Sequence, residues 1–361
     1  MKRWNSFVKG AFPLAALALA LPANAMTFNV TFDSSVTSLA NAAQVEAAFT
    51  NATKVFQSLY TNVMTVNLTI YFSNGVALGQ SGFALTGNPT YAQVTNALRA
   101  ARTTAADSNS VASLPPNDPT GGGTWWIPTA EAKALNGFLG TATNDPSEDG
   151  SVTFASTVSF TFDATNRAVP GKYDFISVAE HEISEVLGRG YSLNVGGDGY
   201  QPYDLFRFTN SGARSLNVND TNVFFSVDNG VTPLKYFYTN ANFGDVQDWQ
   251  KDNPADSYDA FLTIGQEGLL SSADLTALDI LGFDLNFAIR RLSGARLGNG
   301  SFQLTFTNVS GLNFSILAST NIAAAVTNWS VLGAPVENPV GQYQFTDLVT
   351  NKARFYRVRL N

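Results

Sequence analysis

Near the start of the folded part of the chain, hydrophobic and polar positions alternate in two short stretches. Residues 27–32 (TFNVTF) and 66–72 (VNLTIYF) have the period of two that is typical of β-strands. Between them, apolar residues recur at helical spacing: Val45, Ala48, Phe49, Ala52, Val55, Phe56, Leu59 and Tyr60. A helix with one apolar face packs against a sheet. We therefore expect the first domain to begin as strand, helix, strand.

The rest of this domain shows further elements. Residues 91–102 predict a helix, and residues 113–124 (SLPPNDPTGGGT) predict a loop because Pro and Gly at that density break both periodicities. Residues 151–162 (SVTFASTVSFTF) predict one long strand, and residues 272–282 predict a short closing helix. The chain from 200 to 243 reads as irregular and strand-rich. Together these elements predict an α/β (α+β) domain with a twisted mixed sheet.

From about Arg290 the pattern changes to short alternating strands separated by turn residues, as in SFQLTFTNV, NFSILAST and ARFYRVRL. An all-β unit of this length is ordinarily a small sandwich. We therefore expect residues 26–285 to form one domain and residues 290–361 to form a separate C-terminal β-sandwich module.

The first 25 residues have the features of a signal peptide. A basic start is followed by an apolar run over residues 11–21 and by the small residues Ala23-Asn24-Ala25. The apolar run is too short for the roughly 20 residues that a spanning helix needs, and Pro13 interrupts it. We expect cleavage before Met26 and a secreted or extracytoplasmic protein with no integral membrane segment.

Charge and cysteine content narrow the possible functions. The chain has a formal net charge of -7, and loss of the three basic residues of the signal peptide makes the mature protein more acidic. Repulsion between like charges argues against nucleic acid and anionic membranes as partners, whereas an excess of carboxylates suits divalent cations. Cys is absent, which excludes disulfides, thiolate ligands and a Cys nucleophile.

The most informative segment is HEISEVLGRGY, residues 181–191. We expect Asp174 to cap a helix that ends at Gly188 in a left-handed conformation. On this helix His181 and Glu185 are four residues apart, so their side chains leave the same face and can bind one cation. Glu182 lies beside them, where a carboxylate can act as the general base of metal-assisted hydrolysis.

At these residues the chain resembles a family of secreted bacterial zincin metallopeptidases, close to the metzincin pattern HEXXHXXGXXH. The resemblance extends through most of residues 27–285, including the segments KYDFISVAEHEI, PYDLFRF, VFFSVDNG, DWQKD and SADLTALDILGFDL. Some members of this family carry HEISEV at the motif. The resemblance implies a zincin-like catalytic domain, a divalent metal, and a protein or peptide substrate.

The chain departs from the family pattern at two ligand positions. Glu185 stands where the second His would be and Tyr191 where a metzincin places its third, and His181 is the only histidine. A His and carboxylate site can hold Zn, and it accepts Mn or Ca more readily than a three-His site does. Asp204 is our first candidate for the third ligand. Asp248 and Tyr191 are alternatives, and an Asp is preferred because a neutral phenol binds metal weakly.

Two functions follow, from different classes. One is a metal-dependent endopeptidase with Glu182 as base and a substrate strand paired against the edge of 151–162. The other is a catalytically silent zincin that serves as a binding or surface-associated protein, an alternative that the missing histidines favour. Glu180 is interpreted as a solvated charge. The chain has no GXSXG elbow, and the glycines at 121–123 lack the Lys and Ser or Thr of a phosphate loop.

Overall fold

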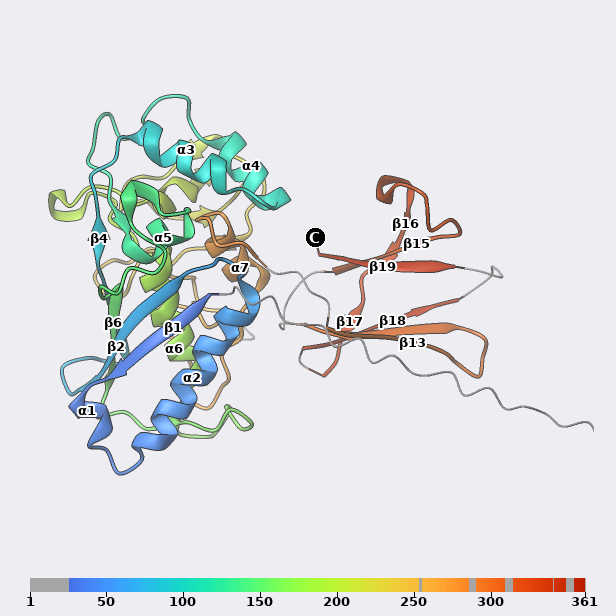
Figure 1. The fold of residues 1–361 in the computed structure, drawn as a ribbon, viewed down its shortest axis with the longest axis horizontal. Coiled ribbons are helices and arrows are strands. Elements are labelled where there is room, and N and C mark those ends of the chain that lie inside the picture. The colour runs from blue at the N-terminus through green and yellow to red at the C-terminus, as the bar shows by residue number, and fades with distance from the viewer. Residues whose placement is uncertain are drawn as a thin grey trace, which may run out of the picture.

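The computed structural model describes residues 26–252, 255–285, 290–308, 314–339, 341–348 and 354–360 (Figure 1). The predicted signal peptide, residues 1–25, lies outside the described residues. The chain is a mixed α/β protein with several small sheets, which agrees with the predicted class at that level. Within the described ranges, no helix combines the length and the apolar character that crossing a bilayer requires.

A four-stranded sheet lies next to the candidate site, with the strand order β1-β2-β6-β3. β1 (Thr27–Phe32), β2 (Thr65–Ser73) and β6 (Gly150–Ala155) are parallel to one another. β3 (Gly79–Phe83) pairs antiparallel with β6 and forms one edge of the sheet. The strands predicted at 27–32 and 66–72 are confirmed.

The single long strand predicted over 151–162 is wrong. β6 ends at Ala155, because its neighbour β2 ends at Ser73, whose carbonyl accepts the N–H of Ser156 as the chain turns away. The apolar residues that follow form β7 (Phe160–Thr161), which pairs with β8 (Tyr173–Asp174) in a separate two-stranded sheet. β6 also lies inside its sheet, and the edge next to it belongs to β3.

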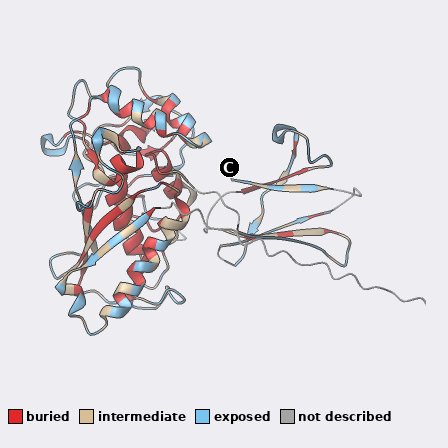
Figure 2. Cartoon of the chain, viewed as in Figure 1, coloured by how far each residue is buried: buried red, intermediate tan, exposed pale blue. Residues whose placement is uncertain are grey.

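Two helices pack together against this sheet. α2 (Ala42–Leu59) buries the apolar face that its periodicity predicts, and it contacts α6 (Phe175–Ser184), which also contacts β3 and β6 (Figure 1). Phe154 of β6 and Phe175 of α6 lie with ring centroids 4.4 Å apart. Figure 2 shows buried residues along α6 and the strands beside it. The helix that carries the candidate site is therefore held rigidly in the core.

Shorter elements complete the first domain. The predicted helices at 91–102 and 272–282 are confirmed as α3 (Tyr91–Ala101) and α7 (Ser272–Asp279). The other α-helices are α1 (Ser34–Thr37), α4 (Ala105–Ser113) and α5 (Thr129–Ala134). The remaining helical turns are η1 (Phe138–Gly140), η2 (Glu185–Arg189), η3 (Val195–Gly197) and η4 (Pro202–Phe206). The remaining strands are β4 (Leu85–Thr86), β5 (Ile127–Pro128), β9 (Arg207–Asn210), β10 (Ala213–Arg214), β11 (Phe224–Phe225) and β12 (Lys235–Tyr236).

From Arg290 onward the chain forms two further sheets. One has the order β13-β14-β18-β17 and the other β16-β15-β19. Aromatic rings join them, since Phe314 lies 5.1 Å from Phe306 and 4.9 Å from Tyr343 between centroids. A short turn, η5 (Val326–Asn328), precedes β16. The strands are β13 (Arg290–Arg296), β14 (Phe302–Thr307), β15 (Phe314–Ser319), β16 (Ser330–Gly333), β17 (Val336–Glu337), β18 (Gln342–Asp347) and β19 (Phe355–Leu360).

Candidate metal centre

The site-bearing helix begins and ends as its sequence predicts. The carboxylate of Asp174 accepts the N–H of Ile176 at 3.1 Å and caps α6. The helix continues into η2, where Gly188 adopts a φ of 127° that favours glycine. A Cβ at that position would also lie 3.0 Å from the carboxylate of Glu131. Local sequence therefore sets both the length of the helix and the turn after it.

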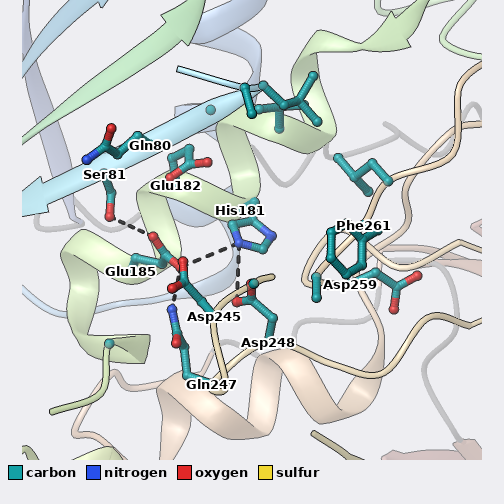
Figure 3. Close-up of a pocket in the computed structure, with 18 of the residues that line it drawn as sticks. Gln80, Ser81, His181, Glu182, Glu185, Asp245, Gln247, Asp248, Asp259 and Phe261 are labelled. Carbon is teal, nitrogen blue, oxygen red and sulfur yellow. Dashed lines mark hydrogen bonds and ion pairs between the residues drawn. The ribbon is translucent and has the colours of Figure 1, made fainter. Parts of the chain in front are cut away.

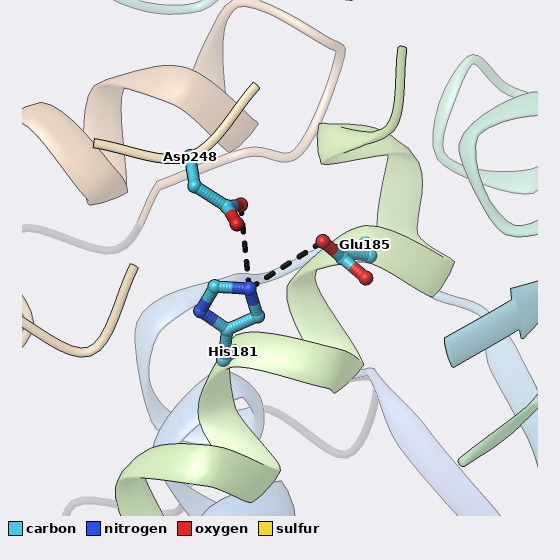
Figure 4. A group of neighbouring side chains, drawn as sticks. All are labelled: His181, Glu185 and Asp248. Carbon is cyan, nitrogen blue, oxygen red and sulfur yellow. Dashed lines mark ion pairs between the residues drawn. The ribbon is translucent and has the colours of Figure 1, made fainter. Parts of the chain in front are cut away.

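His181 and Glu185 meet on one face of this helix. Nε2 of His181 lies 3.4 Å from Oε1 of Glu185 and 3.3 Å from Oδ1 of Asp248, which comes from a distant segment (Figure 4). Within the described part of the chain, these three are the one group of potential metal ligands whose atoms lie within 4.8 Å of one another. All three side chains are largely buried.

The orientation of His181 is fixed from its far side. Nδ1 lies 2.9 Å from the carbonyl oxygen of Ser257. When Nδ1 donates to that carbonyl, the lone pair of Nε2 points at the two carboxylates, which is the tautomer that a metal ligand needs. Burial lowers the pKa of His181, but the negative charge of Asp248 and hydrogen bonds to both carboxylates outweigh it and raise the pKa well above its usual value.

Two polar side chains hold the carboxylate of Glu185. Ser81 Oγ donates to Oε2 at 2.6 Å and Gln247 Nε2 donates to Oε1 at 2.8 Å (Figure 3). Burial raises the pKa of Glu185, but the hydrogen bond and charge of His181, with Arg189 and Ser81, lower it to about 2. Glu185 is therefore ionised at neutral pH. Ser81 lies on β3 and Gln247 in an irregular segment, and no motif in the sequence marks either residue.

A buried guanidinium lies behind the two carboxylates. Nη1 of Arg189 is 2.7 Å from Oδ1 of Asp248, and Nη2 is 3.6 Å from Oε1 of Glu185. Its Nε donates to Ser184 Oγ at 2.7 Å, and its plane covers the ring of Tyr258 at 4.4 Å. Sequence reasoning missed this residue, although a single Arg in the last turn of the site helix marks it.

Asp204, the third ligand preferred from sequence, lies outside the group. Its carboxylate accepts N–H groups at the start of η4 and in the preceding loop, from Gln201 and Leu193 at 3.0 Å and from Ser192 at 3.3 Å. Burial raises its pKa to about 6. Backbone N–H groups of the PYDLF turn and of the preceding loop thus occupy the Asp204 carboxylate. Asp248 lies beside His181, in the position that was expected for Asp204. Tyr191, the other alternative, lines the cavity.

Glu180 is also not the solvated charge that the sequence indicated. It is 2 % exposed, it accepts the Ser257 hydroxyl at 2.9 Å, and it lies 3.5 Å from Arg167. Because Ser257 also provides the carbonyl that contacts His181, Glu180 supports the imidazole from behind.

Glu182 faces a cavity of about 640 Å³ beside the three ligands (Figure 3). It is 6 % exposed, and among the described residues no hydrogen bond or ion pair engages its carboxylate. Burial, followed by the negative charge of Glu185, raises its pKa well above the usual value. β3 forms one wall through Gly79, Gln80 and Ser81. Segments 243–248 and 259–262 contribute to the opposite wall.

Comparisons of this chain with models of known protein families, with curated proteins and with solved structures give no match. What the site does must therefore be argued from its own geometry.

Proposed function

We propose that the mature chain is a secreted, zincin-type, metal-dependent endopeptidase. The observation that carries this proposal is the meeting of His181, Glu185 and Asp248 at the floor of a cavity that Glu182 also lines. Perturbed carboxylates in a cleft are typical of catalytic sites.

The donor atoms suit a divalent cation. One imidazole nitrogen and two carboxylate oxygens form a ligand set that Zn accepts and that Mn or Ca tolerates. The tautomer that Ser257 favours leaves Nε2 free to coordinate. Bound there, the cation would supply a Lewis acid that polarises a carbonyl and lowers the pKa of water.

Glu182 would take the proton of the attacking water and later deliver it to the leaving amine. A general base must lie within reach of the water that it deprotonates, and Glu182 directly follows His181 and lines the same cavity as the three ligands. Glu182 is also unengaged among the described side chains, so it is free to exchange protons. Ser81 and Gln247 meanwhile keep Glu185 from turning away.

The free edge of β3 supports a peptide as substrate. β3 is an edge strand, and four of its residues line the cavity. An extended peptide can pair with such an edge through backbone hydrogen bonds, which places a peptide bond in the cavity whatever its side chains. This edge replaces the one expected on residues 151–162.

Arg189 favours the second candidate, a silent zincin-like binding protein. Its cation already compensates Asp248 and Glu185, so the site can exist without a metal when His181 is protonated. In that case the cavity would be a binding cleft only.

The test is elemental analysis of the purified mature chain together with an assay on unfolded casein, for wild type and Glu182→Gln. We expect about one transition metal per chain in both proteins and loss of turnover in the variant alone, because an amide keeps the shape but accepts no proton. Absence of any bound divalent cation after metal loading would exclude the enzyme and leave the silent protein.

A further inference from the structure

Charge is divided unevenly along the chain. Residues 26–285 contain eleven Lys and Arg against 26 Asp and Glu, whereas residues 290–361 contain seven Lys and Arg against two Asp and Glu. The net charge of the whole chain hides this difference. Repulsion between like charges therefore disfavours anionic partners at the first domain but not at the β module.

Most of this positive charge lies on two strands at one side of the module. β13 is the end strand of one sheet and β19 is the end strand of the other. Phe302 of β14 joins them, because its ring covers Gly294 of β13 and stacks on Tyr356 of β19 at 5.0 Å between centroids. The two strands therefore border the same rim of the two stacked sheets. We call the exposed arginines of this border the arginine rim: Arg291, Arg296, Arg357 and Arg359.

No described carboxylate lies within ion-pair distance of the arginine rim. The two acidic side chains of the module are engaged elsewhere. Asp347 accepts Arg354 at 2.6 Å and the hydroxyl of Tyr356 at 2.7 Å, and Glu337 accepts the N–H of Gly341 at 2.6 Å. The four guanidinium groups are thus available to an anionic partner.

Apolar surface lies beside these charges. Along β19, Phe355, Arg357 and Arg359 are exposed in alternation with the less exposed Tyr356 and Val358. Phe355 is 37 % exposed, and the guanidinium of Arg357 lies 5.5 Å from the ring centroid of Trp329. The surface therefore offers both planar cations and an aromatic face.

We propose that the arginine rim binds an acidic polysaccharide and anchors the enzyme to it. A planar guanidinium group donates pairs of parallel hydrogen bonds to two oxygens of a carboxylate or of a sulfate group. The apolar faces of sugar rings pack on aromatic side chains such as Phe355. Two strands of this length form a track of roughly 20 Å, which fits an extended polymer better than a small anion.

A structural role for the same arginines is protection of two sheet edges against pairing with other chains. Charge reversal separates the two roles. Glutamate protects an edge as well as arginine does, but it repels a polyanion. The Arg357→Glu/Arg359→Glu variant should therefore stay folded and keep the oligomeric state of wild type while losing the polysaccharide.

The experiment measures binding of the mature chain to immobilised polygalacturonate and heparin at low salt, with neutral dextran as reference. The matched control is Lys54→Glu/Arg102→Glu, which changes the net charge equally at exposed positions of the first domain. We expect the acidic wild-type protein and the control to bind both polyanions, and the rim variant to bind at least tenfold more weakly. Binding should weaken as salt is raised.

The proposal is overturned if wild type binds neither polyanion, or if the rim variant binds the polyanions as tightly as wild type does. It is also overturned if wild type binds dextran as tightly as it binds the polyanions. Preference for duplex DNA or for phosphatidylglycerol vesicles would assign the rim to another partner. Dimerisation lost in the rim variant, without polysaccharide binding, would assign it to the acidic domain of a second copy. None of these results bears on the metal site.

Discussion

Arg189 and Asp248 form a buried ion pair in which the carboxylate oxygen that contacts Nη1 at 2.7 Å also lies 3.3 Å from Nε2 of His181. One oxygen thus serves both a permanent cation and a candidate metal ligand. The arginine holds Asp248 in place, and it also competes with any metal for negative charge. Loss of Arg189 should therefore change both the stability of the site and its affinity for metal.

We predict that Arg189→Met lowers the free energy of unfolding by about 3–5 kcal/mol in metal-free buffer, because two buried carboxylates lose their compensating charge. Added Zn should restore part of this loss and bind more tightly than in wild type. The measurement is urea denaturation with and without metal. Arg207→Met is the matched control, because Arg207 is as deeply buried and lies over Phe237 at 4.4 Å. Equal recovery of both variants by Zn would show that the effect is unspecific.

The second prediction concerns the third ligand. Asp248→Asn should lose bound metal, as His181→Ala and Glu185→Ala should, whereas Asp204→Asn should keep it because Asp204 lies outside the group. Glu185→His should keep or strengthen Zn binding by supplying a nitrogen ligand. The number of metal ions per chain, measured by mass spectrometry after dialysis, shows which carboxylate is the third ligand. Loss of metal from Asp204→Asn with retention in Asp248→Asn would reverse our assignment.

The third prediction tests the closeness of β3 to the candidate base. A Cβ on Gly79 would collide with Oε1 of Glu182 and would lie 2.8 Å from Cγ1 of Val178. Gly79→Ala should therefore lower stability by about 1–3 kcal/mol and reduce turnover at least tenfold. Adding Glu182→Ala should recover part of the stability, and adding the isosteric Glu182→Gln should not. A double-mutant cycle without coupling between the two positions would contradict this placement.

The parts of the site that sequence predicted are those that depend on local spacing. His181 and Glu185 meet because four residues separate them on one helix, and the cap at Asp174 and the turn at Gly188 are local as well. A helix and two strands of the first domain were predicted for the same reason. Periodicity needs only neighbouring residues, whatever the rest of the fold does.

What sequence missed depends on contacts between distant segments. Asp204 and Asp248 both lie outside regular α-helices and strands, so no periodicity distinguished the carboxylate that caps a turn from the one that reaches His181. The sequence indicated an exposed, solvated charge at Glu180. The side chain is buried because it packs against Ser257 and Arg167. The edge position of β3 follows from strand order, which the sequence did not reveal.

The fourth prediction concerns pH and a carboxyl group far from the metal centre. Burial, followed by the charge of Asp107, raises the pKa of Asp279 to about 8, and Thr104 donates to its Oδ2 at 2.6 Å. Between the unfolded pKa near 4 and this value the native state binds the extra proton, so stability falls as pH rises. Asp279→Asn should therefore gain about 1–3 kcal/mol over wild type at pH 9 and nothing at pH 4. Asp198→Asn, at an exposed position, is the control in the same denaturation series. An equal gain in stability at pH 9 in this control would contradict the explanation by the raised pKa of Asp279.

The last prediction concerns where the first domain ends. Thr61 donates its N–H to Asp284 at 2.9 Å, Asn62 contacts Gly282 at 2.9 Å and Asp284 at 2.7 Å, and Leu285 forms a bridge with Tyr60. A chain of residues 26–285 keeps all of these contacts, so it should be soluble and cooperative in unfolding, and it should bind metal as the full chain does. A chain ending at Leu281 loses them and leaves the buried side chain of Asn62 with its 3.4 Å hydrogen bond to the carbonyl of Ala134, which should cost about 2–4 kcal/mol. Circular dichroism during urea denaturation compares the two. Aggregation of the 26–285 chain would show instead that the β module covers part of the first core.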